Sequence, residues 1–129
     1  MGRGAKVRMA DYFDSAVKAW RILGPSFIRA VNEGLDDDHV VKLCAFLSGR
    51  NLIRSLNLRR NKIGDRGAIA IANYIRTADK ALTSLELERN EIEDEGGEAL
   101  LEAMQNNMRM ECCKLAYGNP LRSKICRQI

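Results

Sequence analysis

Two stretches of sequence decide the fold: residues 53–75 read IRSLNLRRNKIGDRGAIAIANYI, and residues 82–104 read LTSLELERNEIEDEGGEALLEAM. Laid over each other at an offset of 29, they agree in residue type at eight positions, including an Asn and a Gly. Agreement of this kind indicates an internal repeat. The matched pairs are Ile53 and Leu82, Leu56 and Leu85, Leu58 and Leu87, Asn61 and Asn90, Ile63 and Ile92, Gly67 and Gly96, Ile71 and Leu100, and Ile75 and Met104.

Each copy is predicted to form a strand, a turn and a helix. Apolar alternation from Ile53 to Leu58 predicts a short strand. Asn61 follows where the chain must turn, and an inward amide there can donate to backbone carbonyls and accept from backbone N–H groups. Asp65 is the predicted N-cap of a helix whose apolar residues recur at helical spacing from Ala68 onward. One such unit buries little alone, so stacked units complete the core.

The pattern L-x-x-L-x-L-x-x-N-x-I/L, followed by a helix in a unit of 28 to 29 residues, resembles the leucine-rich repeat. The unit length and the Gly before the helix are similar to the ribonuclease-inhibitor subclass of that family. The resemblance implies an α/β solenoid, in which parallel strands line a concave face and helices cover the convex face. It also implies that the protein binds other proteins and needs no cofactor. Two copies are clear, at residues 53–81 and 82–109.

Two further units, at residues 25–52 and 110–129, depart from the pattern. In the first, Glu33 stands in place of the Asn and His39 in place of the Gly, so the pattern leaves open whether this unit has a strand. In the second, Asn119 is present, but one extra residue precedes it and no helix follows. We expect a partial repeat and a C-terminal cap there.

An amphipathic helix is predicted ahead of the repeats, over residues 10–24. Phe13 and Trp20 follow its helical spacing, and Gly24-Pro25 ends the segment. Because the ends of a solenoid expose apolar edges that need covering, we interpret this helix as the N-terminal cap. The alternative is a helix that binds a partner.

Composition favours a single globular domain. The chain has 129 residues, of which 46% are hydrophobic and 29% are charged. Its 21 Lys and Arg face 17 Asp and Glu, and the excess lies near the two ends, so no basic field for nucleic acid covers the whole molecule. With neither a secretory signal nor a spanning helix, we expect a cytoplasmic protein with reduced cysteines. Nucleic-acid binding through the basic ends and a lipid on Cys126 are alternatives.

The sequence contains few of the residue patterns that catalysis or metal binding requires. His39 is the single imidazole, and the Asp cluster beside it, at residues 36–38, lacks the alternate spacing of a calcium loop. The spacing of the four cysteines fits no zinc pattern. We therefore predict no catalytic, cofactor or metal site and no small-molecule substrate.

Alternation along the strands defines the candidate binding residues. Because Leu56 and Leu58 point inward, their neighbours point out onto the concave face. Ala116 is predicted to follow Glu88 across the sheet, with Tyr117 level with Arg89 at the strand ends. Tyr and Arg dominate protein-binding sites, so the two Arg at strand ends and Tyr117 are the strongest candidates. The full candidate set is Asn57, Arg59, Arg60, Glu86, Glu88, Arg89, Lys114 and Tyr117.

The charges on this face also support a purely structural interpretation. Parallel strands lie about 4.8 Å apart, so opposite charges at the repeat offset can pair between neighbouring units. Exposed pairs of this kind contribute about 0–1 kcal/mol each. The predicted pairs are Arg59–Glu88, Glu86–Lys114, Lys62–Glu91 and Arg66–Glu95.

The function expected from these features is that of a non-enzymatic adaptor or scaffold subunit. It would bind another protein, of unknown identity, through the concave strands or the exposed ends of the solenoid. Fold analogy offers two alternatives, a regulator of a small GTPase and an actin-binding protein, although a fold does not by itself carry a function.

Overall fold

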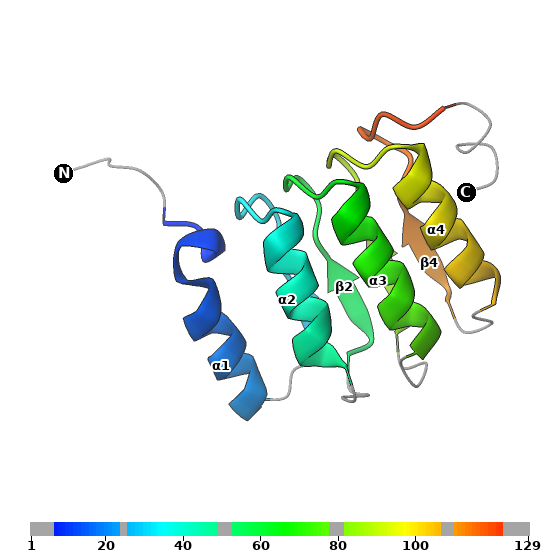
Figure 1. Ribbon diagram of the computed structural model, residues 1–129. Coiled ribbons are helices and arrows are strands. Elements are labelled where there is room, and N and C mark those ends of the chain that lie inside the picture. The colour runs from blue at the N-terminus through cyan, green and yellow to red at the C-terminus, as the bar shows by residue number, and fades with distance from the viewer. Residues whose placement is uncertain (1–6, 24–25, 49–52, 78–81, 107–109, 123–129) are drawn as a thin grey trace.

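The computed structural model describes residues 7–23, 26–48, 53–77, 82–106 and 110–122. Strands and helices alternate along the chain, and the helices stand in one row (Figure 1). The elements in chain order are the 3₁₀ turn η1 (Met9–Tyr12), α1 (Phe13–Leu23), β1 (Phe27–Arg29), α2 (Asp37–Leu47), β2 (Ser55–Asn57), α3 (Asp65–Thr77), β3 (Ser84–Glu86), α4 (Asp94–Gln105) and β4 (Cys112–Lys114).

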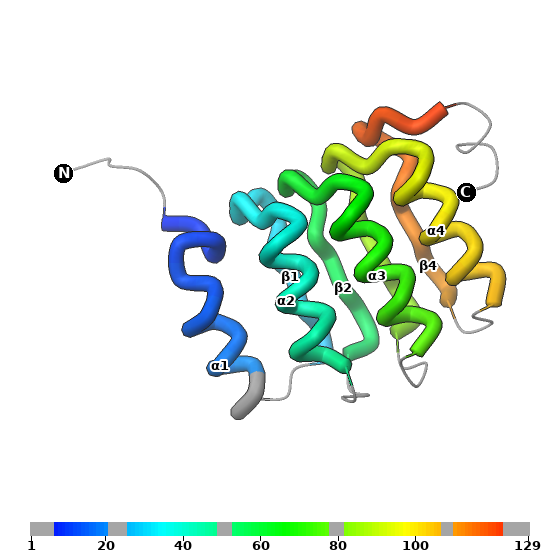
Figure 2. Tube along the Cα trace, in the orientation of Figure 1, coloured from blue at the N-terminus to red at the C-terminus, as the bar shows by residue number. Residues whose placement is uncertain are grey.

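One parallel sheet runs through the stack. Its strand order is β1–β2–β3–β4, so each strand pairs with the strands of the neighbouring units. The register aligns Ile28, Leu56, Leu85 and Cys113. Figure 2 shows the strands behind the row of helices, with β1 behind α2. This arrangement confirms the predicted α/β solenoid, with strands on one face and helices on the other.

A single apolar core lies between the sheet and the helices. Leu56 and Leu58 in the β2 unit are fully buried, as are Leu85 and Leu87 in the β3 unit and Ile71 of α3. Each Leu or Ile buried in this way contributes about 1.5–3 kcal/mol relative to exposure. Because every unit adds side chains to the same core, the core is continuous along the stack.

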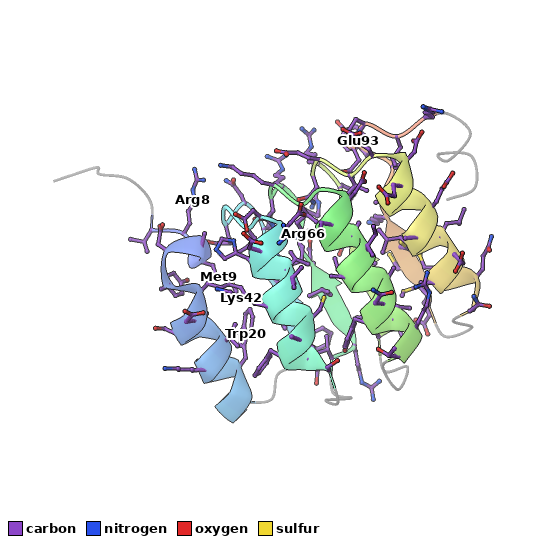
Figure 3. The ribbon with its side chains drawn as sticks, in the orientation of Figure 1. Arg8, Met9, Trp20, Lys42, Arg66 and Glu93 are labelled. Atoms are coloured by element: carbon purple, nitrogen blue, oxygen red, sulfur yellow. The ribbon has the colours of Figure 1, made fainter. Side chains whose placement is uncertain are left out.

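The N-terminal helix packs on the first unit. Met9 of η1 and Phe13 of α1 are buried in the core, and Trp20 is partly buried against it. Figure 3 shows Met9 and Trp20 in the space between α1 and α2. This packing favours the capping role predicted for the helix, while Tyr12 stays exposed.

The first unit contains a strand, a point that its irregular sequence left open. Ile28 and Ala30 are buried, and β1 pairs with β2 in the register of the other units. Glu33, at the position of the repeat's Asn, uses its longer side chain to accept a hydrogen bond from Met9 N at 2.8 Å. The departure from Asn therefore ties this unit to the N-terminal turn.

Buried asparagines connect the turns of successive units. Asn61 Oδ1 accepts hydrogen bonds from Glu33 N and Leu35 N, both at 3.0 Å and both in the preceding unit. Asn61 Nδ2 donates to Ala30 O at 2.7 Å and to Leu58 O at 2.9 Å. The amide thus donates to carbonyls and accepts from N–H groups, as predicted, and its partners lie in two units instead of one.

The same bonds recur further along the chain. Asn90 Oδ1 accepts from Asn61 N and Ile63 N. Asn119 Oδ1 accepts from Asn90 N and Ile92 N. Each of these turns therefore receives its hydrogen-bond acceptor from the unit that follows it.

A second ladder, made of aspartates, runs along the starts of the helices. The prediction that Asp65 caps its own helix is wrong: Asp65 is the first residue of α3, and its Oδ1 accepts from Glu93 N at 2.8 Å and Gly96 N at 3.0 Å. Asp65 therefore caps α4, in the next unit. Asp37 caps α3 in the same way, through the N–H groups of residues 64 and 67, at 2.7 and 3.0 Å.

The aspartate ladder explains the recurring Gly. A Cβ at Gly67 would lie 2.6 Å from Asp37 Oδ1, and one at Gly96 would lie 2.7 Å from Asp65 Oδ1. Both distances are too short for a real contact, so the approach of the neighbouring carboxylate requires Gly. The first helix of the stack has no preceding repeat to supply an Asp, and it carries His39 at this position.

Local contacts close the two ends of the stack. Asp36 caps α2 within its own unit: Asp36 Oδ1 accepts from His39 N, and Asp36 N donates back to His39 Nδ1, both at 3.1 Å. At the other end, Asp94 Oδ1 accepts from Arg122 N at 2.9 Å, and the Arg122 guanidinium lies 2.7 Å from Asp94 Oδ2.

Within the described residues no helix is both long enough and apolar enough to cross a bilayer.

We predict that Asn90→Ala lowers the free energy of unfolding by about 3 kcal/mol or more, because each buried backbone group left without a partner costs about 1–3 kcal/mol. The control is Asn73→Ala at an exposed position of α3, which should change the unfolding free energy by about 0.5 kcal/mol or less. Urea unfolding followed by circular dichroism measures both. Equal losses from the two variants would show that the ladder is not a main support of the stack.

The Asp36 cap should give a pH-dependent contribution to stability. The hydrogen bond from His39 N lowers the pKa of Asp36 below its ordinary value. A carboxylate with a lowered folded-state pKa stabilises the fold above its unfolded pKa of about 3.9, and this contribution is lost as the pH falls through the folded value. Asp36→Ala should cost about 1 kcal/mol at neutral pH, the usual effect of losing an N-cap. The difference between wild type and variant should shrink in acid; a difference that is constant with pH would mean that the charge plays no part.

Candidate functional site

The solvent-facing side of the sheet, opposite the helices, carries the predicted binding residues; we call it the strand face. The strand register defines two rows of side chains that cross it from β1 to β4. All members of both rows are at least partly exposed. The first row is Phe27, Ser55, Ser84 and Cys112, and the second is Arg29, Asn57, Glu86 and Lys114.

The two ion pairs predicted across the sheet are confirmed. Arg59 Nε lies 3.3 Å from Glu88 Oε1, and Lys114 Nζ lies 3.9 Å from Glu86 Oε1. Arg59 Nε and Glu88 Oε1 are both buried and have no hydrogen-bond partner within the described residues, so their mutual attraction is the main compensation for their lost hydration. The Lys114 side chain is about half exposed, so its pair contributes about 0–1 kcal/mol.

The two pairs predicted at the helix starts do not form. Arg66 contacts Asp38 of the preceding unit instead of Glu95 of the following one. No ion pair within the described residues joins Lys62 to Glu91. The repeat offset fixes which residues are level with each other, but a long side chain at a helix start can reach either neighbouring unit.

Tyr117 occupies a different position from the one predicted. Its carbonyl accepts a hydrogen bond from Arg89 N at 2.9 Å, as the carbonyl of Glu88 accepts from Arg60 N at 3.0 Å. Tyr117 is therefore the equivalent of Glu88, and the residue after it, Gly118, is the equivalent of Arg89. The prediction that Ala116 follows Glu88 across the sheet is wrong, because the chain takes up its extra residue before Tyr117.

Tyr117 and Arg89 form one contact at the edge of the strand face. Arg89 Nη2 donates to Tyr117 Oη at 2.8 Å, and the guanidinium carbon lies 4.8 Å from the ring centroid. Such cation–π contacts contribute about 0.5–1 kcal/mol at exposed sites. The Tyr117 side chain is still 63% exposed, so much of its surface is open to a partner.

Phe27, which is 69% exposed at the start of β1, is a member of the strand face that was not among the predicted binding residues. It stands level with Ser55 at the outer edge of the sheet. The signal was present in the alternation around Ile28, which is buried while Phe27 and Arg29 are exposed. The irregular pattern of the first unit did not establish a strand there, so no outward-facing residue was predicted from it.

His39 and the buried cysteines have structural roles. His39 holds the start of α2, and its ring packs edge-on against Phe13 at 5.0 Å between centroids. Burial raises the pKa of the Cys44 and Cys113 thiols to about 12, which leaves both protonated and unreactive at neutral pH. Within the described part of the chain, no group of three or more His, Cys, Asp or Glu could hold a metal. Cys126 lies outside the described residues.

Known proteins share both the repeat and the fold. A family model described as Leucine Rich repeat matches residues 51–72 and 80–101, which are the starts of the two clear units. These two units are leucine-rich repeats. The fold of this repeat protein is similar to a solved structure of leiomodin-1 actin-binding site 2, with a TM-score of 0.74 and 20% sequence identity over 90% of this chain and 71% of that one. No curated protein sequence matches the chain.

The backbone of this leucine-rich repeat protein holds two arginines in an unfavourable conformation. Arg60 and Arg89 have φ angles of 58° and 57°, in the left-handed region. Equivalent positions in the outer units are Asn32, with φ 57°, and Gly118, with φ 77°. Asn and Gly tolerate this region, whereas other residues meet a penalty of about 1 kcal/mol or more. Both central units thus place an Arg where the backbone favours a smaller residue.

We predict that Arg60→Asn leaves the repeat protein as stable as wild type or raises its unfolding free energy by about 1 kcal/mol, because Asn relieves the left-handed strain. The matched control is Arg60→Ala, which removes the same side chain but keeps the strain. Urea unfolding should therefore rank the Asn variant above the Ala variant. Equal stabilities would mean that the positive φ carries no measurable penalty here.

Proposed function

We propose that this leucine-rich repeat protein is a non-enzymatic protein-interaction module, an adaptor or scaffold subunit that binds another protein through its strand face. The observation that carries the proposal is the pair Arg60 and Arg89, which are exposed and held in a left-handed conformation that costs stability. Strain of this kind tends to be found at functional sites. Stacking of the units does not use either guanidinium as an ion-pair partner within the described residues.

The proposed contact residues fall into two groups. Arg60, Arg89 and Tyr117 are exposed and would be the energetic centre, since Arg and Tyr are the usual hot-spot residues. The remaining members are held by contacts within the sheet, four of them in cross-strand ion pairs and Asn57 through a hydrogen bond from Arg59 N, and would give the face its shape and its pattern of charge. This second group is Asn57, Arg59, Glu86, Glu88 and Lys114.

The finer parts of the proposal rest on the resemblance of the repeat. Unit length and the Gly in the first turn of α3 and of α4 support the ribonuclease-inhibitor subclass. The reduced state of Cys44, Cys112 and Cys113 supports a cytoplasmic location, since reducing compartments keep thiols free.

Actin binding is a second candidate, because the similar solved structure is an actin-binding site of leiomodin-1. At 20% identity the likeness extends to the fold alone. Co-sedimentation with filamentous actin tests this candidate directly. A GTP hydrolysis assay with small GTPases tests the regulator alternative, in which added protein would accelerate hydrolysis.

Site-specific photocrosslinking tests the strand face. A photoreactive phenylalanine analogue at Ser84 samples the centre of the strand face, and the same analogue at Glu98 samples exposed surface on α4. In an extract of the source cells, we expect a protein adduct from the Ser84 variant and none of the same mass from the Glu98 variant. The adduct should disappear when Tyr117→Ala is added. An adduct from Glu98 alone would place binding on the helices and overturn the proposal.

A further inference from the structure

The strand face carries more positive than negative charge, although residues 86–102, which begin at the end of β3, are rich in Asp and Glu. Five cations and two carboxylates lie in its rows and at its strand ends. Both carboxylates are taken: Glu88 pairs with Arg59, and Glu86 pairs with Lys114. Arg29, Arg60 and Arg89 form no ion pair within the described residues. Arg54 and Glu111, the residues directly before β2 and β4, carry opposite charges and so leave the net charge of this surface unchanged.

Most of the acidic residues that follow Glu88 in the sequence belong to the helical layer. From Glu91 onward, the chain approaches and then forms α4. Figure 3 shows Glu93 at the start of α4. Folding therefore places the acids of residues 93–102 at the start of α4 and within it, whereas the unpaired arginines lie on β1 and after β2 and β3.

We infer that the strand face binds an acidic, extended segment of a partner protein, with carboxylates on Arg60 and Arg89 and an apolar or aromatic residue against Tyr117. The inference rests on the proposed function and adds the chemistry of the partner. The guanidinium groups of Arg29, Arg60 and Arg89 have no carboxylate partner within the described residues, so charge complementarity favours an acidic ligand. Arg suits this task since its planar fork binds carboxylates in a bidentate manner.

The spacing of the rows fits a short segment. Neighbouring strands are about 4.8 Å apart, so the Arg60 and Arg89 backbones stand about one strand spacing from each other. Four strands span about 14 Å, a width that about four or five extended residues cross at 3.3–3.4 Å each. The cation–π contact with Tyr117 holds the Arg89 guanidinium in place before binding, which reduces the entropy lost when a carboxylate binds.

A peptide fits the pattern of charge better than a nucleic acid does. Glu86 lies in the same cross-strand row as Arg29, and Glu88 directly precedes Arg89. A nucleic-acid strand carries a charge at every phosphate and would bring some of them against these carboxylates. A peptide can place acidic residues over the arginines and neutral residues over the two Glu.

Fluorescence anisotropy with a defined probe tests the inference. The probe is a fluorescein-labelled peptide, GEDEWEG, and its neutral counterpart is GQNQWQG. Wild type should bind the acidic peptide at least about tenfold more tightly than the neutral one, a difference of about 1.4 kcal/mol. Raising the ionic strength from about 0.05 M to about 0.3 M should weaken binding, because exposed charges are screened.

A charge-matched pair of double variants locates the binding. Arg60→Asn with Arg89→Asn removes two charges from the strand face and should weaken binding at least about tenfold. Arg66→Asn with Arg76→Asn removes two charges from α3 in the helical layer and should leave binding unchanged. Melting curves of both variants should stay close to wild type, so that a loss of binding is not a loss of fold.

Three outcomes would overturn the inference. They are equal binding of the two peptides, equal weakening by the two double variants, and tighter binding of a fluorescein-labelled oligouridylate than of the acidic peptide. If the Ser84 crosslink forms but the acidic peptide does not bind, the inference of an acidic partner is wrong, while the proposed protein binding through the strand face is supported. If the crosslink forms from Glu98 alone, the strand face itself fails.

Discussion

The stack depends on hydrogen bonds that leave one unit and end in the next. Asn61 accepts from the turn before it, and Asn90 accepts from the turn that contains Asn61. Asp37 and Asp65 do the same for the helix starts of α3 and α4. A unit taken alone would therefore leave buried N–H groups without an acceptor, at about 1–3 kcal/mol each. Folding of the units is cooperative for this reason as well as because of the shared core.

Hydrogen bonds that pass from unit to unit leave groups without a partner at the two ends of the stack. The irregular outer units supply partners for these groups. Glu33 replaces the Asn and accepts from Met9 N, which fixes the N-terminal turn. Asp36 and His39 cap α2 from within their own unit, because no earlier repeat supplies an Asp. At the far end, residue 122 satisfies the last Asp of the ladder through both its backbone and its side chain. The irregular features of the outer units therefore replace bonds that a regular neighbouring unit would make.

The repeat offset alone was enough to predict the solenoid, the inward Asn and the two cross-strand ion pairs, because each depends on residues that are level with each other. The predictions that were wrong concern features for which the local sequence allows more than one arrangement. An Asp at a helix start ordinarily caps that helix, so the sequence gives no sign that Asp65 caps α4 instead. The extra residue before Asn119 has several possible places, and the hydrogen bond from Arg89 N shows that it comes before Tyr117. The left-handed backbone at Arg60 has no signature in the sequence, since Arg is an unusual residue there.

At four equivalent positions of the repeat the backbone is left-handed, and the residues found there show which ones suit this geometry. The outer units place Asn32 and Gly118 there, and both residues accept a positive φ at little cost. The central units place arginines at the same geometry, so the backbone alone does not account for them. Within the described residues, the stack uses neither guanidinium in an ion pair, and the two carboxylates on the strand face are already occupied. The Arg89 guanidinium contacts Tyr117 of the next unit, but neither arginine has a carboxylate partner within the described residues, and an acidic partner would supply one.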